Sequence, residues 1–173
     1  MKRLSILFLL ITSLIFTACD TAKPKDDPEI NVKLTVSDLT DEDYESVGTK
    51  GLENPTKDDF KNIKFTLDVT HSNNITNRNV VIPNIQKAIN KYDKNRYWFG
   101  QTFKQDNENE NFAKYSDTMV LYSKGLDNKD IKEIFKSAVV KISWTDKDNG
   151  GEKEVNLSDI IQFKKSPTLA SHS

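Results

Sequence analysis

The chain has 173 residues, and its 25 Lys and Arg against 26 Asp and Glu give a formal net charge of −1. This near balance argues against nucleic acid as a partner, because nucleic-acid binding requires a concentrated basic surface. The single cysteine, Cys19, excludes a disulfide within the chain, and the length suits one domain with its own hydrophobic core.

The first 18 residues have the pattern of a secretory signal peptide. Lys2 and Arg3 form a positively charged start, and residues 4–16 carry no charge. This run is shorter than the roughly 20 residues that a membrane-spanning helix needs. Thr17 and Ala18 are small, as a peptidase requires immediately before its cut. We therefore expect residues 1–18 to be a signal peptide.

Cys19 follows these small residues directly. Residues 16–19, Phe-Thr-Ala-Cys, resemble the lipobox of bacterial lipoproteins, with Phe16 where leucine is commonest. The resemblance implies thioether lipidation of Cys19, cleavage before it and acylation of the new amino terminus. Several acyl chains together hold a protein stably at a membrane. Two alternatives stay open: an ordinary signal peptide that leaves Cys19 as a free thiol, and a buried core helix.

Residues 19–28 are expected to form a lipidated tether. Pro24, Pro28 and alternating charges leave almost nothing apolar to pack into a core. Cleavage before Cys19 removes two basic residues, so 23 basic residues remain against 26 acidic ones and the formal charge becomes −3. The abundance of Lys and Asn is typical of an AT-rich genome and a Gram-positive host.

Residues 29–164 are predicted to form one mostly β domain. Apolar and polar side chains alternate along several short segments, which is the pattern of strands with one buried face. An acidic loop at residues 37–59 contains a helical turn near 41–45, and a short apolar run lies at 80–82. The predicted strands are residues 30–36, 63–69, 97–103, 116–123, 138–145 and 152–157, with a closing strand near 160–163.

Two short helices interrupt these strands. Pro83 suits a helix start, and apolar residues then recur at helical spacing, which predicts a helix at residues 84–92. Asp127 can cap the amide of Asp130, so a second helix is expected to begin there. Asn149-Gly150 is a strong hairpin signal because both residues tolerate a positive φ.

Six to eight short strands and two short helices predict an all-β domain, an antiparallel immunoglobulin-like β-sandwich. The Cys-Trp-Cys framework of antibody domains is absent, so the prediction concerns architecture alone. Residues 165–173 are expected to be a flexible tail. From Leu126 through the capped helix and residues 142–145, Ile-Ser-Trp-Thr, to Ile161, the chain is similar to small uncharacterised Bacillus-type lipoproteins. That resemblance implies no activity.

No pattern indicates catalysis, a cofactor or a metal. His71 and His172 are the two histidines and lie far apart, whereas a metal site needs convergent ligands. Residues 146–151 resemble the start of a calcium loop, but Leu157 stands where a bidentate acid is needed, which favours a hairpin turn. The acidic residues between 38 and 45 are interpreted as a solvated surface. We therefore do not expect this protein to be an enzyme.

Aromatic residues are the candidates for recognition. Trp144 shares an expected inward face with Ile142, which favours core packing. Tyr97 and Phe99 alternate with Trp98, so if those two point inward, Trp98 is exposed beside Tyr97. An exposed Trp next to a Tyr can stack on a sugar or anchor a protein partner. The alternative is a central strand that is buried on both faces.

These patterns predict a lipoprotein on the extracytoplasmic face of the cell membrane, anchored through Cys19. We expect a non-enzymatic interaction or structural module of the envelope, with an envelope protein or a glycan as its partner. A small-ligand- or ion-binding surface lipoprotein is the alternative. A deep polar pocket would favour that alternative, and a flat apolar patch would favour a protein partner.

Overall fold

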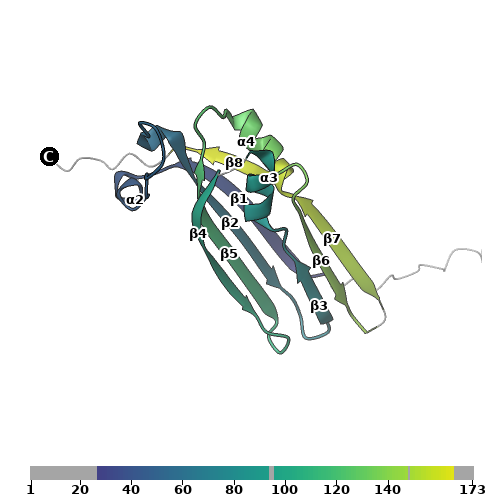
Figure 1. Cartoon of the computed structure of the whole chain (residues 1–173). Helices are drawn as coiled ribbons and strands as arrows, with labels where there is room; N and C mark the ends of the chain where they lie inside the picture. The colour runs from purple at the N-terminus through teal and green to yellow at the C-terminus, as the bar shows by residue number, and fades with distance from the viewer. Residues whose placement is uncertain (1–26, 94–95, 148, 166–173) are drawn as a thin grey trace, which may run out of the picture.

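The computed structural model describes residues 27–93, 96–147 and 149–165. Within them, eight strands form two sheets, one of five strands in the order β4-β5-β2-β1-β8 and one of three in the order β3-β6-β7 (Figure 1). The strands are β1 (Glu29–Asp38), β2 (Phe60–Thr70), β3 (Thr76–Val81), β4 (Tyr97–Asp106), β5 (Phe112–Tyr122), β6 (Val139–Thr145), β7 (Gly150–Asn156) and β8 (Ile161–Lys164).

Four short α-helices and one 3₁₀ turn connect these strands, where the sequence predicted two helices and one helical turn. They are α2 (Asp41–Glu45), the 3₁₀ turn η2 (Lys57–Asp59), α3 (Ile85–Tyr92), α4 (Asn128–Ile134) and α5 (Leu157–Ile160). The protein is therefore mostly β, as predicted, and its two sheets are compatible with a sandwich-like fold. Its strands are not all antiparallel, because β1 and β8 pair in parallel, with Leu34 opposite Ile161.

The main hydrophobic core joins both sheets to helices α3, α4 and α5. Along β2, the alternating residues Ile63, Phe65, Leu67 and Val69 are at most 1% exposed. The β6 face that carries Trp144 is buried as well, as the period-two pattern predicted. Alternation thus turns one face of each sheet toward a shared core.

A second, smaller cluster packs on the opposite face of the large sheet. Its buried members are Leu39, Val47, Phe60 and Val120, and half-buried aromatic residues surround them. Phe60 begins β2, and Leu39 and Val47 belong to the segment around α2. The acidic segment between β1 and β2 is therefore held against the sheet by its few apolar side chains.

The strand register brings several turns to one end of the molecule. Glu29 pairs with Thr70, Thr70 pairs with Phe112, and Thr76 pairs with Thr145. The first residue of β1 therefore lies at the same end as the β2–β3, β4–β5 and β6–β7 turns (Figure 1). We call this the turn end.

Candidate functional site

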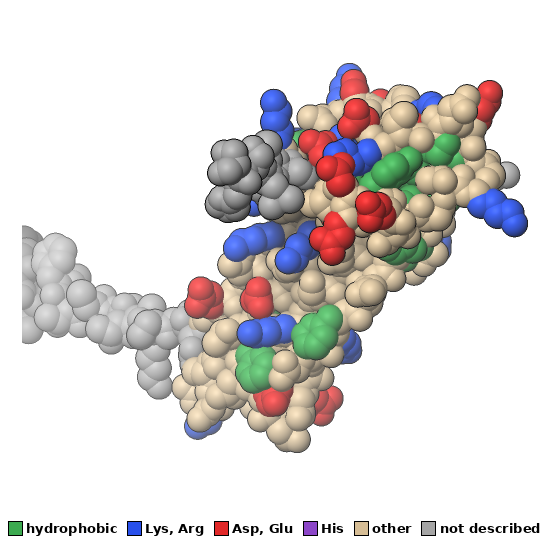
Figure 2. Space-filling view, turned by 90° about the vertical axis from the view of Figure 1, so that its left-hand side faces the viewer, with side chains coloured by type: hydrophobic (Ala, Val, Ile, Leu, Met, Phe, Trp, Pro, Cys, Tyr) green, Lys and Arg blue, Asp and Glu red, His purple; other side chains and the backbone are tan. Residues whose placement is uncertain are grey.

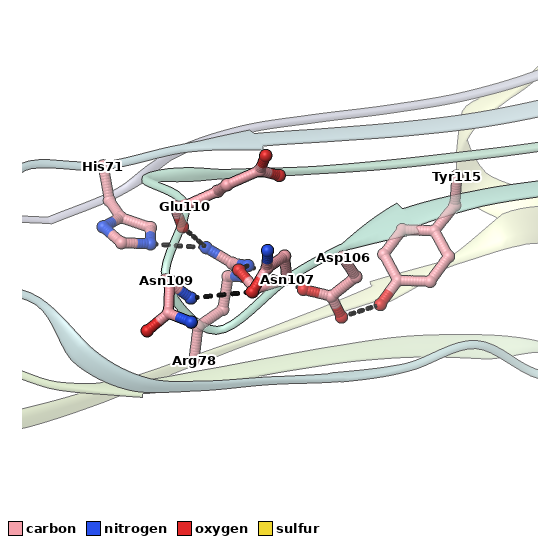
Figure 3. A network of polar contacts seen from close by, with 7 residues as sticks. All are labelled: His71, Arg78, Asp106, Asn107, Asn109, Glu110 and Tyr115. Carbon is pink, nitrogen blue, oxygen red and sulfur yellow. Dashed lines mark hydrogen bonds and ion pairs between the residues drawn. The ribbon is translucent and has the colours of Figure 1, made fainter.

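Polar side chains from three segments converge at the turn end (Figure 3). They come from the β2–β3 turn, from the start of β3 and from the β4–β5 turn with its flanking strands. We call them the Arg78 network; its members are His71, Arg78, Asp106, Asn107, Asn109, Glu110 and Tyr115.

Arg78 is the centre of this network, and its side chain is only 5% exposed. Its Nη2 lies 2.6 Å from Asp106 Oδ1, and its Nη1 lies 2.6 Å from His71 Nε2. The guanidinium also donates to the main-chain carbonyls of Glu110 at 3.0 Å and Asn107 at 3.2 Å. Because β3 belongs to the small sheet and Asp106 to the large one, Arg78 connects the two sheets.

Asp106 accepts a second hydrogen bond from the Tyr115 hydroxyl. Burial is the largest single effect on the pKa of Asp106 and raises it. The hydrogen bonds from Tyr115 and Arg78 and the charge of Arg78 together lower the pKa by more, so it ends below its ordinary value. Burial, followed by the hydrogen bond to Asp106, raises the pKa of Tyr115. At neutral pH the network thus contains a charged carboxylate and a protonated phenol.

His71 has both ring nitrogens engaged. Its Nδ1 lies 2.8 Å from the carbonyl oxygen of Ser72, and its Nε2 faces Arg78. A carbonyl only accepts and a guanidinium only donates, so this pairing assigns the proton to Nδ1 and the lone pair to Nε2. His71 therefore supports Arg78 and has no nitrogen left for a metal or for proton transfer.

A polar hollow of about 440 Å³ opens beside this network. Its wall includes His71, Arg78 and Glu108, together with four asparagines at positions 73, 77, 109 and 111. Two buried atoms of the network, Arg78 Nε and Glu110 Oε2, have no hydrogen-bond partner among the described residues. Asparagine amides both donate and accept, so this wall suits a polar ligand that hydrogen-bonds.

A smaller hollow of about 210 Å³ lies between the start of α3 and strands β4 and β5. Asp117 lines it from the inward face of β5, opposite Thr102 of β4. A Cβ at Gly100 would lie 2.8 Å from the Tyr97 hydroxyl, so glycine leaves the Tyr97 side chain its room. A carboxylate and hydroxyl groups thus share this hollow.

Tyr97 and Trp98, the predicted recognition residues, are both half-buried. Tyr97 packs against the main core, whereas Trp98 packs in the second cluster with its ring centroid 6.1 Å from that of Phe60. The condition for an exposed Trp98, that Tyr97 and Phe99 both point inward, is not met, because a register shift between Tyr97 and Phe99 interrupts the alternation. Trp98 is correspondingly less exposed than that alternation implied.

Phe99 and Phe103 are instead the exposed aromatic residues of β4, at 42% and 55%. The alternation in the sequence grouped them with Tyr97, and it gave no sign of the register shift that turns both to the outer face of the sheet. Figure 2 shows that exposed hydrophobic side chains on this side of the molecule form small groups among charged ones. The apolar surface visible on this side is therefore local and does not form one broad patch.

The segment that resembles a calcium loop forms the β6–β7 hairpin turn. The main-chain N–H of Asn149 donates to Asp146 Oδ1 at 2.8 Å, and Thr145 pairs with Gly150. Among residues 27–93, 96–147 and 149–165, no group of three or more His, Cys, Asp or Glu side chains could hold a metal ion.

The predicted lipidation site, Cys19, lies outside the described residues, as do residues 1–18 and His172. No helix in the described part of the chain is long and apolar enough to cross a membrane. Comparison of the chain with protein-family models, with curated proteins and with solved structures finds no match.

Proposed function

We propose that this protein is a lipoprotein of the extracytoplasmic membrane surface, held by lipid on Cys19, and that its domain is a non-enzymatic interaction module of the cell envelope. The lipobox-like residues 16–19 support the anchor. The observation that carries the interaction role is strand β4, an edge strand with two exposed phenylalanines. Exposed aromatic side chains on an edge strand suit recognition of another protein.

The chain path is compatible with this arrangement. Residues 19–28 connect the anchor to Glu29, which lies at the turn end. A tether of this length spans at most about 35 Å when fully extended. On this proposal Glu29, at the turn end, therefore lies within about 35 Å of the membrane surface.

An immunoglobulin-like β-sandwich is the finer architecture that we attach to this proposal. Two sheets that share one hydrophobic core support it. The parallel pairing of β8 with β1 and the helices α3 and α4 at the core are additions to the simple antiparallel pattern. Such a scaffold presents its edges and loops to partners while the core stays fixed.

Crosslinking in intact cells tests the interaction role. Cells that make the full chain are treated with a membrane-impermeant crosslinker, and adducts are isolated through the protein. We expect an adduct that Phe103→Lys removes and that Val81→Lys preserves, since Val81 is 49% exposed but lies on β3. If no adduct depends on Phe103, β4 is not an interaction surface and the proposed role is wrong.

A small-ligand-binding lipoprotein is the second candidate, and the asparagine-lined hollow favours it. A ligand that binds only the folded state raises the unfolding midpoint. We would screen sugars and amino acids against the full chain and repeat any positive result with Asn109→Ala and, as a control, Asn31→Ala on the outer face of β1. A midpoint that no compound raises would remove this candidate, as would a shift that Asn109→Ala preserves.

A further inference from the structure

The sheet edges of the described chain differ in their protection. An open strand edge can pair with another chain, and proteins limit this with short strands, charges or bulges. Edge strand β8 has four residues, and β7 carries Glu152, Lys153 and Glu154 in succession. Edge strand β3 carries Arg78 and a register shift. Each of these three edges is therefore protected in one of the usual ways.

Strand β4 has this protection only toward its two ends, in the register shift near Trp98 and in Lys104 and Asp106. It has ten residues, and none from Tyr97 to Phe103 is charged. Its outer edge pairs with no strand in the described part of the chain. Beyond the register shift near Trp98, the strand pairs regularly with β5 from Phe99 to Asp106. The stretch from Phe99 to Phe103 is therefore both regular and uncharged, and it is suited to accept another strand.

The two exposed phenylalanines lie on the same face of this edge strand. Phe99 pairs with Val120 and Phe103 pairs with Ser116, and these β5 residues are four positions apart. Alternation therefore turns all four side chains to the outer face of the large sheet. A strand added at this edge would cover both rings as well as satisfy the open backbone groups.

We propose that this edge strand is completed by β4 of a second copy, antiparallel, with Gln101 opposite Gln101 of the partner subunit. Phe99 and Phe103 lie two residues on either side of Gln101. A two-fold axis there puts each Phe99 directly opposite Phe103 of the partner subunit, on one face. This register pairs all four rings as two Phe99–Phe103 contacts between the copies. Aromatic cross-strand pairs of this kind stabilise antiparallel sheets.

The charges of β4 are compatible with self-pairing. The five residues from Phe99 to Phe103 are uncharged, so no like charges oppose each other in the proposed register. Lys104, the next residue, has its ammonium 5.5 Å from the centre of the Tyr115 ring within its own copy. Pairing joins two five-stranded sheets into one sheet and removes the open β4 edge from both copies.

This inference rests on the proposed function in one respect, that β4 is an interaction surface. It specifies the partner as a second copy of the chain. Lipid anchoring in one membrane would raise the effective concentration of the copies, which favours a contact of this small size.

Cysteine crosslinking tests the register. Since Cys19 is the chain's own single cysteine, a cysteine introduced on β4 is the only other thiol in the chain. In membranes from cells that make the full chain, Gln101→Cys is treated with a short thiol-specific crosslinker. We expect an adduct of twice the protein's mass, which the unsubstituted chain does not give. Gln105→Cys is the matched control on the same strand. In the proposed register its two copies lie about 27 Å apart, so we expect at least tenfold less adduct.

A second substitution tests the contact itself. Phe103→Lys in the Gln101→Cys chain should reduce the adduct at least tenfold, whereas Val81→Lys should preserve it; equal unfolding midpoints verify that both variants fold. The proposal is overturned by no double-mass adduct, by equal crosslinking through Gln105→Cys, or by an adduct that Phe103→Lys preserves. A β4-dependent adduct with a different protein also overturns it, but leaves the proposed interaction role intact.

Discussion

Trp144 is the residue at which packing follows most directly from sequence alternation. It is 9% exposed, and it pairs across the hairpin with Gly151 of β7. A Cβ at Gly151 would overlap Cζ2 of the Trp144 ring. The indole therefore lies over a glycine, which supplies the space for it.

We predict that Trp144→Ala lowers the free energy of unfolding by about 3–5 kcal/mol, because it removes buried apolar surface and leaves a cavity. Lys141→Ala is the control on the opposite face of β6. Lys141 is exposed and pairs with exposed Glu154, so its loss should change stability by about 0.5 kcal/mol or less. Denaturant unfolding measures both values; equal midpoints for wild type and Trp144→Ala would contradict core packing.

Some side-chain contacts could be predicted from the sequence and others could not. Asp127 was predicted to cap Asp130, and its Oδ1 accepts from the Asp130 amide at 2.9 Å. That prediction needed only local spacing. Arg78 and Asp106 are 28 residues apart and belong to different sheets, so no local pattern indicates their contact. The Arg78 network could therefore not be predicted from sequence motifs, which suggested His71 only as a possible metal ligand.

At the scale of elements, the Arg78 network joins β3 to the β4–β5 turn. One guanidinium donates to the carboxylate of Asp106, to the imidazole of His71 and to two main-chain carbonyls. Loss of the guanidinium would leave the Asp106 carboxylate, which is 19% exposed, without its counter-charge. Breaking a buried ion pair from one side is costly for this reason.

We predict that Arg78→Ala lowers the free energy of unfolding by about 3 kcal/mol or more. Arg78→Lys should recover only part of this, since an ammonium cannot reproduce the planar fork of donors. Lys136→Ala, which removes an exposed pair with Glu133, should cost about 0.5 kcal/mol or less. Chemical denaturation of the three variants is the measurement. An Arg78→Ala protein as stable as Lys136→Ala would show that Arg78 does not stabilise the contact between the two sheets.

Most elements could be predicted because their signals are local. Helix α2 begins with a capping box formed by Thr40 and Asp43, and α4 begins with one formed by Asp127 and Asp130. The four-residue helix α5 was not predicted, because it is too short to show a helical period. The parallel pairing of β8 with β1 joins opposite ends of the domain, and alternation within either strand gives no indication of its partner.

At the scale of the whole molecule, three carboxylates in the described part of the chain have a pKa below the ordinary value of 3.8: Asp59, Asp106 and Asp130. The main-chain hydrogen bond at Thr56 is the largest cause for Asp59, and the one at Asp127 is the largest for Asp130. A carboxyl whose folded pKa is depressed stabilises the fold above its unfolded pKa, and this contribution is lost as pH falls through the folded pKa.

We therefore predict that the free energy of unfolding falls as the pH decreases from about 5 to about 2, because the unfolded chain takes up protons first. Asp106→Asn should make this acid slope shallower, in addition to any loss of stability at neutral pH. Denaturant titrations at a series of pH values test both statements. A slope that Asp106→Asn leaves unchanged would mean that Asp106 does not contribute to acid sensitivity.

The membrane location that we propose for the whole molecule depends on lipid at Cys19, and the most direct test is membrane fractionation of cells that make the full chain. We predict that the wild-type protein incorporates labelled palmitate and stays with the membrane after a high-salt wash. Cys19→Ala should lose the label and leave the membrane fraction, whereas Thr21→Ala, two residues along the tether, should behave as wild type. A Cys19→Ala protein that remains in the washed membranes would contradict the lipid anchor.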